Sequence, residues 1–196
     1  MSTRIFKALI PFAFVAACAG ESSREATDKL SLSLRGSDLV LGAPPNYCFD
    51  PVSRDRNAVG LSVLLADCAI LGVGEPQAPV YGAVLSATVM REDTPGDLAE
   101  LERFLRSEPG RLAMGGGSDV VVLESLREDG VLYLKIRGDA GAALPTASQD
   151  QWRGFFSLSD RLVSVSVTGF QGAAPSDERA RGMIEAMATR SRTLSG

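Results

Sequence analysis

The feature that most constrains this fold is an alternation of apolar and polar residues, which recurs in many short segments between residues 30 and 168. A period of two is typical of a strand with one buried face, whereas helices repeat every three or four residues. The alternating segments lie at residues 30–41, 59–68, 81–89, 120–136 and 152–168. Because turn-forming residues separate them, the pattern predicts an antiparallel sheet.

Two of the connections have strong turn signals. Asp129-Gly130 is a two-residue turn of the type that joins hairpin strands, and Ser159-Asp160-Arg161 joins a second pair. In the strand that follows the second turn, the apolar residues Val163, Val165 and Val167 alternate with serine and threonine. We therefore expect this strand to have one buried face and one face in contact with water.

Two segments change to the period of a helix. Asp97-Leu98-Ala99-Glu100 has the form of a capping box, and Pro109-Gly110 is expected to stop or break the helix that begins there. Pro175-Ser176-Asp177 opens a closing helix with an apolar face. The predicted class is α+β, with two main helices covering one face of an antiparallel sheet. With 45% apolar residues, positions 30–196 are expected to form a single domain.

Ahead of this domain, Val15-Ala16-Ala17-Cys18 resembles the lipobox of bacterial lipoprotein precursors. The apolar run before it is too short for a membrane-spanning helix, so residues 1–17 are interpreted as a signal peptide. The resemblance implies a lipid on Cys18, and Ala19 behind it favours the outer membrane over the inner one. Residues 18–29 are small and polar, as in a flexible tether. Cleavage before Gly20 by ordinary signal peptidase, giving a soluble periplasmic or secreted protein, is the alternative.

Two further cysteines, Cys48 and Cys68, remain after either cleavage. An even pair in an oxidising compartment is expected to form a disulfide. With 19 residues between the cysteines, the bond should stabilise the fold by about 3 kcal/mol on the chain-entropy model. A redox-active or metal-binding pair is the alternative, but the spacing differs from C-x-x-C and the chain has no histidine.

Composition and motifs exclude several functions. Without residues 1–17 the chain has 18 basic and 24 acidic residues, a balance unfavourable for nucleic-acid binding. The lack of histidine excludes Ser-His-Asp and Cys-His catalysis. Gly115-Gly116-Gly117-Ser118 does not fit a phosphate-binding loop, because it follows a helical segment instead of opening one and the chain has no G-K-[ST] motif. We expect no catalytic residues, no nucleotide, no metal and no cofactor.

Some charged and aromatic residues remain candidates for a site. Asp50, Arg54, Asp55 and Arg56 lie between the two cysteines and form a possible binding loop. Paired carboxylates suffice for glycoside hydrolysis, and the candidates are Asp50, Asp55, Asp67, Glu92 and Asp93. The alternative is that these are solvated charges partnered by nearby arginines. Aromatic residues cluster at Trp152, Phe155 and Phe156, either as core or as a binding surface.

Three segments carry a resemblance to uncharacterised secreted proteins and lipoproteins of alphaproteobacteria: residues 47–69, 129–134 and 152–169. That group implies no activity or catalytic residue. The order of elements, with one helix among the strands and one at the end, is also similar to the PsbP/Mog1-like α/β/α sandwich. The expected function is that of a non-catalytic lipoprotein, which binds an envelope protein or another envelope component through the Cys48–Cys68 loop or an exposed sheet face. The alternatives are a small carboxylate-dependent periplasmic hydrolase and an inhibitor of another enzyme.

Overall fold

The computed structural model describes residues 25–34, 37–57, 59–75, 82–93, 97–138 and 146–196. The lipobox with Cys18 lies outside these residues, as does most of the predicted tether, so both stay predictions. In the part of the chain that is described, no helix is both long enough and apolar enough to cross a bilayer.

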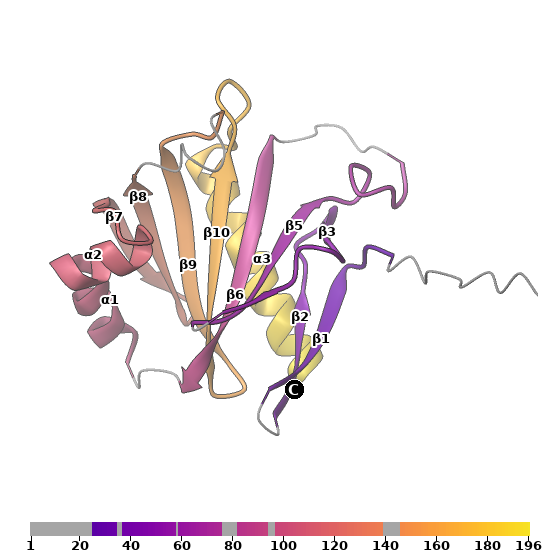
Figure 1. Ribbon diagram of the computed structural model, residues 1–196, viewed down its shortest axis with the longest axis horizontal. Coiled ribbons are helices and arrows are strands. Elements are labelled where there is room, and N and C mark those ends of the chain that lie inside the picture. The colour runs from indigo at the N-terminus through magenta and orange to yellow at the C-terminus, as the bar shows by residue number, and fades with distance from the viewer. Residues whose placement is uncertain (1–24, 35–36, 58, 76–81, 94–96, 139–145) are drawn as a thin grey trace, which may run out of the picture.

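The main sheet has eight strands, all paired in antiparallel fashion (Figure 1). Their spatial order is β3 (Tyr47–Phe49), β5 (Gly60–Asp67), β6 (Ala83–Asp93), β10 (Arg161–Gly169), β9 (Asp150–Leu158), β8 (Val131–Arg137) and β7 (Val121–Glu128), with β4 (Asp55–Arg56) paired to β5. The first predicted hairpin, β1 (Lys29–Leu34) with β2 (Ser37–Gly42), forms a separate two-stranded sheet. The predicted antiparallel α+β class is confirmed.

The two predicted hairpin turns consist of residues that adopt positive φ angles. Asp129 and Gly130 have positive φ angles of 48° and 70°, the left-handed pair that matches the twist of a hairpin, and they join β7 to β8. Ser159 and Asp160, with φ angles of 48° and 61°, join β9 to β10 in the same way. Both predicted hairpins are therefore confirmed.

Three helices are present in the described chain: α1 (Leu98–Arg106), α2 (Glu108–Met114) and α3 (Asp177–Ser195). Asp97 caps α1 by accepting a hydrogen bond from the backbone N–H of Ala99 at 2.9 Å, and Ser176 caps α3. Both predicted helix starts are correct. The sequence did not predict α2, because Pro109 suggested a stop. Ser107 ends α1 and caps α2 at once, and Pro109 lies in the first turn of α2, where no backbone donor is required.

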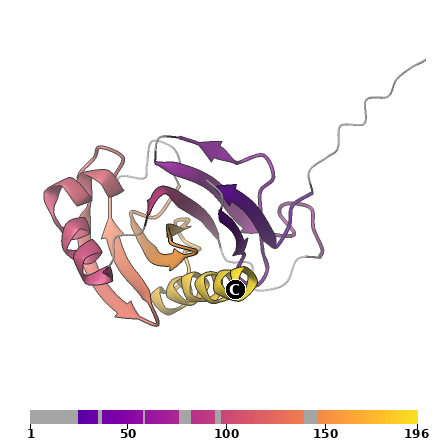
Figure 2. The same cartoon turned by 90° about the horizontal axis from the view of Figure 1, so that it is seen from below.

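The helices lie on opposite faces of the sheet, and Figures 1 and 2 show α3 on one side and α1 with α2 on the other. Alternate residues of the same strand therefore enter two cores. Tyr133 and Phe156 pack in the larger core with α3, whereas Leu132 and Phe155 pack in the smaller core with α1 and α2. The prediction that both helices cover one face is wrong, and the α/β/α arrangement is the observed one.

Strand β10 differs from its prediction for a related reason. Its serine face was expected to be wet, but Leu162 and Ser166 on that face are buried and Ser164 is only partly exposed. The strand is central, between β6 and β9, and Leu162 packs in the core under α1 and α2. Ser166 thus lies in the interior of this sheet face, whereas Ser164 stays partly accessible.

The predicted disulfide is present. Cys48 and Cys68 have a sulfur–sulfur distance of 2.01 Å and a Cα–Cα distance of 4.9 Å, and they link edge strand β3 to the residue after β5. Contacts of the folded domain also extend ahead of residue 30, because Ala26 is buried and Thr27 forms a β-bridge with Phe49.

Candidate functional site

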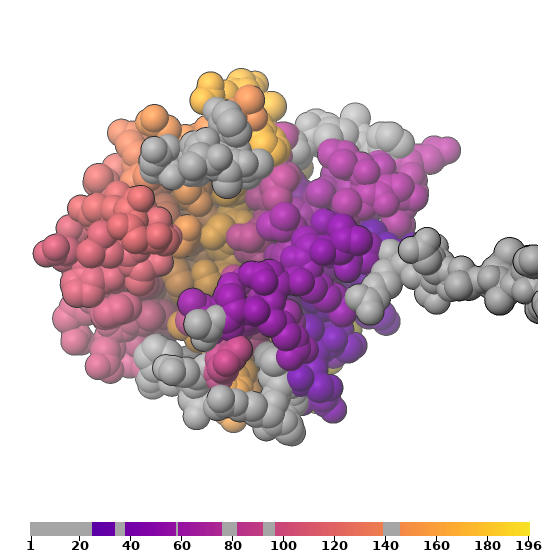
Figure 3. Space-filling model, in the orientation of Figure 1, coloured from indigo at the N-terminus to yellow at the C-terminus, as the bar shows by residue number. Residues whose placement is uncertain are grey.

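An open groove of about 510 Å³ lies between α1–α2 and the sheet, on the face away from α3. We call it the sheet groove. Figure 3 shows the hollow between the salmon α1–α2 segment and the purple β4–β5 segment, with strands β9 and β10 behind it. Its wall on the helix side is apolar, being formed by Leu101, Phe104, Leu105, Ala113 and Met114.

The floor of the sheet groove is a row of small hydroxyl residues beside aromatic and aliphatic ones. Strand register places Ser62 opposite Thr88, Thr88 opposite Ser164, and Ser164 opposite Phe155. The hydroxyls of Ser62 and Thr88 are 2.9 Å apart and share a hydrogen bond. The groove is therefore amphipathic, with hydroxyls at β5, β6 and β10 and apolar groups at β9 and along the helices.

Arg153, on β9, is the single charged residue among the described residues that line the sheet groove. Its cross-strand neighbours are Leu134 and Ser166, and its Nε is buried without a hydrogen-bond partner. Burial lowers the pKa of its guanidinium below the ordinary value. Even so, an arginine stays charged at neutral pH. The groove thus holds a cation that no described acidic residue neutralises.

Sequence reasoning missed Arg153. The available signal was a charged residue inside the aromatic strand segment Trp152–Phe156, where every second side chain must enter the same core. Trp152, Gly154 and Phe156 face α3, and so Arg153 and Phe155 must face the helices on the other side.

The rim of the sheet groove is formed by large apolar side chains that contact water. Phe104 of α1 is 50% exposed, and Val59, just before β5, is 59% exposed. Asn57 lies next to Val59 and accepts hydrogen bonds from the backbone N–H groups of Val59 and Gly60 at 3.0 and 3.1 Å. Exposed apolar residues on both sides of one hollow are typical of binding surfaces.

The predicted binding loop lies beside this rim and not inside the groove. Arg54, Asp55 and Arg56 are exposed, and Asp50 accepts a hydrogen bond from the backbone N–H of Val52 at 3.0 Å. Arg56 lines a separate hollow of about 220 Å³. The residues of the Cys48–Cys68 segment that do line the sheet groove are Asn57, Val59 and Ser62.

The structure does not bring the candidate carboxylates Asp55 and Asp67 together. Asp55 pairs with Ser62, whereas Asp67 is five residues further along β5, which is about 16 Å at the usual rise of a strand. Glycosidases keep their two carboxyl groups about 5–9.5 Å apart. The side chains of Glu92 and Asp93 lie outside the described part. In that part, no group of three potential metal ligands lies close enough to hold an ion.

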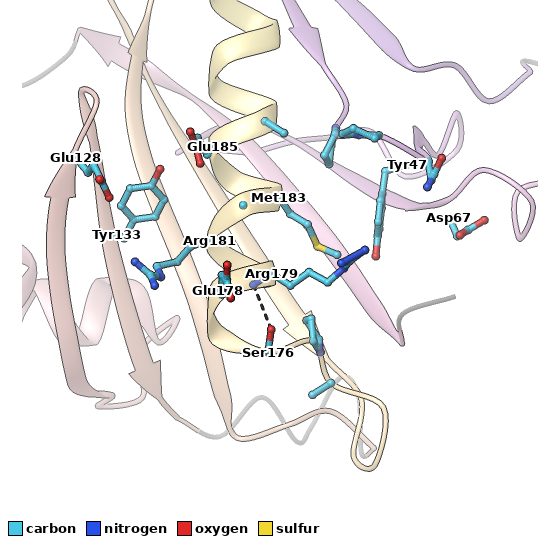
Figure 4. A pocket seen from close by; sticks show the side chains of 17 residues that line it. Tyr47, Asp67, Glu128, Tyr133, Ser176, Glu178, Arg179, Arg181, Met183 and Glu185 are labelled. Atoms are coloured by element: carbon cyan, nitrogen blue, oxygen red, sulfur yellow. Dashed lines mark hydrogen bonds between the residues drawn. The ribbon is translucent and has the colours of Figure 1, made fainter. Parts of the chain in front are cut away.

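The surface beside the N-terminal half of α3 is also hollowed, over about 860 Å³. Figure 4 shows Tyr47 and Asp67 on one side of the helix and Tyr133 and Glu185 on the other. Burial, followed by nearby carboxylates, raises the pKa of each tyrosine to about 12. Both phenols therefore stay protonated at neutral pH, and neither tyrosine is an activated nucleophile there.

The aromatic cluster belongs mainly to the core. Trp152 is buried, donates a hydrogen bond from Nε1 to Asp177 at 2.9 Å, and lies under the guanidinium of Arg181 at 5.5 Å from the ring centre. Phe156 is fully buried against α3. Only Phe155 also lines the sheet groove.

No family model matches the sequence, and no curated protein matches it. Among solved structures, the Ran-binding protein Mog1p of Saccharomyces cerevisiae is 12% identical, with 84% of this chain and 94% of that chain covered at a TM-score of 0.46. Cyanobacterial PsbP (CyanoP) of Synechocystis is 14% identical, with 89% and 96% covered at a TM-score of 0.43. These likenesses concern the fold alone. The predicted similarity to PsbP and Mog1 is found at that level, and the similarity to alphaproteobacterial proteins stays a prediction.

Proposed function

We propose that this chain is a non-catalytic lipoprotein of the bacterial envelope whose domain binds an apolar small molecule in the sheet groove. The observation that carries the proposal is the groove itself, with its apolar helix wall and the exposed Phe104 and Val59 at its rim. Its volume of about 510 Å³ lies within the range of small-molecule sites.

The envelope location is supported by the lipobox at residues 15–18 and by the Cys48–Cys68 disulfide, a bond typical of oxidising compartments. Replacing Cys18 with Ala removes the only position that the lipobox can lipidate. We expect the processed variant to move from the membrane fraction to the soluble periplasmic fraction. A processed variant that still sediments with membranes would contradict lipid anchoring at Cys18.

Binding in the groove is tested with a neutral apolar dye such as Nile red, whose fluorescence rises in an apolar site. The substitutions Phe104→Asp and Val59→Asp place a charge at the rim without entering either core. Each should weaken dye binding about five-fold or more, because losing a partly buried apolar contact costs about 1 kcal/mol. Ile70→Asp is the matched control, since Ile70 is 70% exposed and lies outside the groove. Equal binding by all three variants would refute the proposal.

The sequence also predicts an envelope protein partner, and the same face is the surface to probe. A photoreactive residue at Val59 in living cells would crosslink whatever enters the groove, with Ile70 again as the control position. We expect no reproducible protein adduct specific to Val59. Such an adduct would favour a protein partner over the small molecule.

A further inference from the structure

We propose that the ligand of the sheet groove is a long-chain monocarboxylate, such as a fatty acid, with Arg153 as its counter-ion. This inference rests on the proposed function and specifies the chemistry of the ligand. The starting observation is that one cation lies in the floor of a groove whose other described lining residues are uncharged.

The need for an anion follows from the surroundings of Arg153. Three arginines have a buried Nε without a hydrogen bond: Arg153, Arg161 and Arg181. The guanidinium of Arg181 stacks on Trp152, and that of Arg161 donates to the carbonyl of Arg91. Arg153 has no such compensation from the described residues. A partly desolvated charge without a partner is costly, and an anionic ligand would remove that cost.

A single carboxylate fits better than a more highly charged group. One guanidinium can donate two parallel hydrogen bonds to the two oxygens of one carboxylate. A phosphate carries nearly two charges at neutral pH, and no second cation lines the groove in the described residues to balance it. The hydroxyl of Ser164 has no hydrogen-bond partner in the described chain, so it offers one further donor.

The apolar part of the ligand is inferred from the course of the floor. Arg153 of β9 is opposite Ser166 of β10. Leu162 lies four residues from Ser166 along β10, which is about 13 Å at the usual strand rise. Phe155 lies between these levels, and Leu101 and Phe104 of α1 form the wall beside them. Phe155 and Leu162 are only 2% and 3% exposed, so the apolar chain of a ligand with its head group on Arg153 would pass over them. It would contact the exposed Phe104 at the rim.

The test compares an acid with its uncharged ester. Laurate and methyl laurate, each below the concentration at which it aggregates, are titrated against protein carrying Nile red. We expect laurate to displace the dye at least about ten-fold more effectively, as a charge-assisted hydrogen bond implies. In Arg153→Met the preference for the acid should disappear while binding of the ester persists. Arg103→Met, which removes an exposed arginine of α1, should keep the preference.

Several results would overturn the inference. One is equal displacement of the dye by laurate and methyl laurate in the unaltered protein. Another is a preference for laurate that survives in both Arg153→Met and Arg153→Gln. The third is tighter binding of dodecyl phosphate than of laurate. Far-ultraviolet circular dichroism checks that the variants fold. If the unaltered protein binds Nile red but shows no acid preference, only this inference fails. If it binds no dye, the proposed function fails as well.

Discussion

Replacing Arg153 with Met should make the ligand-free protein more stable. Most arginine substitutions in a folded domain are neutral or destabilising, so the sign of this effect is diagnostic. Arg153 keeps a charge in the floor of the sheet groove, with a buried Nε and no described partner. Methionine retains much of the aliphatic stem and removes the charge, and Leu134 and Phe155 beside it provide apolar contacts.

The magnitude follows from the cost of desolvation. A fully buried ion costs several kcal/mol, and replacing buried charged groups with apolar ones of similar volume often stabilises a protein by about 1–4 kcal/mol. Arg153 is only partly buried, so water lowers that cost. We expect the free energy of unfolding to rise by about 1–2 kcal/mol. For a domain of this size each kcal/mol corresponds to about 2–4 °C in the melting temperature.

The measurement is urea unfolding at neutral pH with the disulfide intact, followed by tryptophan fluorescence. Trp152 is the single tryptophan of the chain and faces α3, on the opposite side of the sheet from Arg153. Arg103→Met is the control and should change stability by less than about 0.5 kcal/mol, as exposed substitutions do. A loss of 1 kcal/mol or more in Arg153→Met, with the control unchanged, would show that Arg153 supports the fold. Arg153 would then not be an unpaired cation in the folded protein.

Three further predictions concern the two glycines and the two tyrosines near α3. Gly154→Ala should destabilise the protein by about 1–3 kcal/mol in the same urea assay, because its Cβ would lie 2.1 Å from the Cγ2 of Ile184; stability equal to that of the unaltered protein would contradict this packing. Gly182→Ala, within α3, should stabilise the protein by about 0.5–1 kcal/mol, because the new Cβ would have no atom within 4 Å other than those of its chain neighbours and its own helix backbone. A loss of stability would show a contact that the structure lacks. Tyr47 and Tyr133 should ionise near pH 12 in the folded protein, read from absorbance at 295 nm. The pKa of each tyrosine in the folded protein exceeds the unfolded value of 10. Their contribution to stability is therefore complete below pH 10 and is lost as the pH rises toward 12. Ionisation of all tyrosines near pH 10 with the fold intact would refute this prediction.

Local structure could be predicted from the sequence to a large extent. The hairpin turns at residues 129–130 and 159–160 depend on residues that tolerate positive φ, and both occur as expected. The helix starts at Asp97 and Ser176 depend on side-chain oxygens that cap the first turn. The Cys48–Cys68 bond was predicted by counting cysteines. Each of these features is set by neighbours in the chain, so a short window of sequence contains its cause.

The candidate site, in contrast, depends on which distant segments become neighbours. Strand β10 pairs with β6 across two helices and three intervening strands, and its central position buries Ser166 on the serine face. No local pattern encodes the pairing, and the predicted wet face is wrong at Ser166 for that reason, whereas Ser164 stays partly exposed. The short helix α2 was likewise missed, because Ser107 serves as cap for two helices.

The sequence by itself therefore determined the strands, the turns, the two longer helices and the disulfide, through periodicity, backbone preference and residue count. Only the tertiary structure decided that α1 and α2 lie on the face opposite α3, and hence that a groove forms beside them. It also decided that Arg153 lies in that groove without a described partner. The physical reason is that burial and charge pairing are properties of the assembled sheet, whereas the alternation along β9 specifies only that Arg153 and Trp152 face opposite sides.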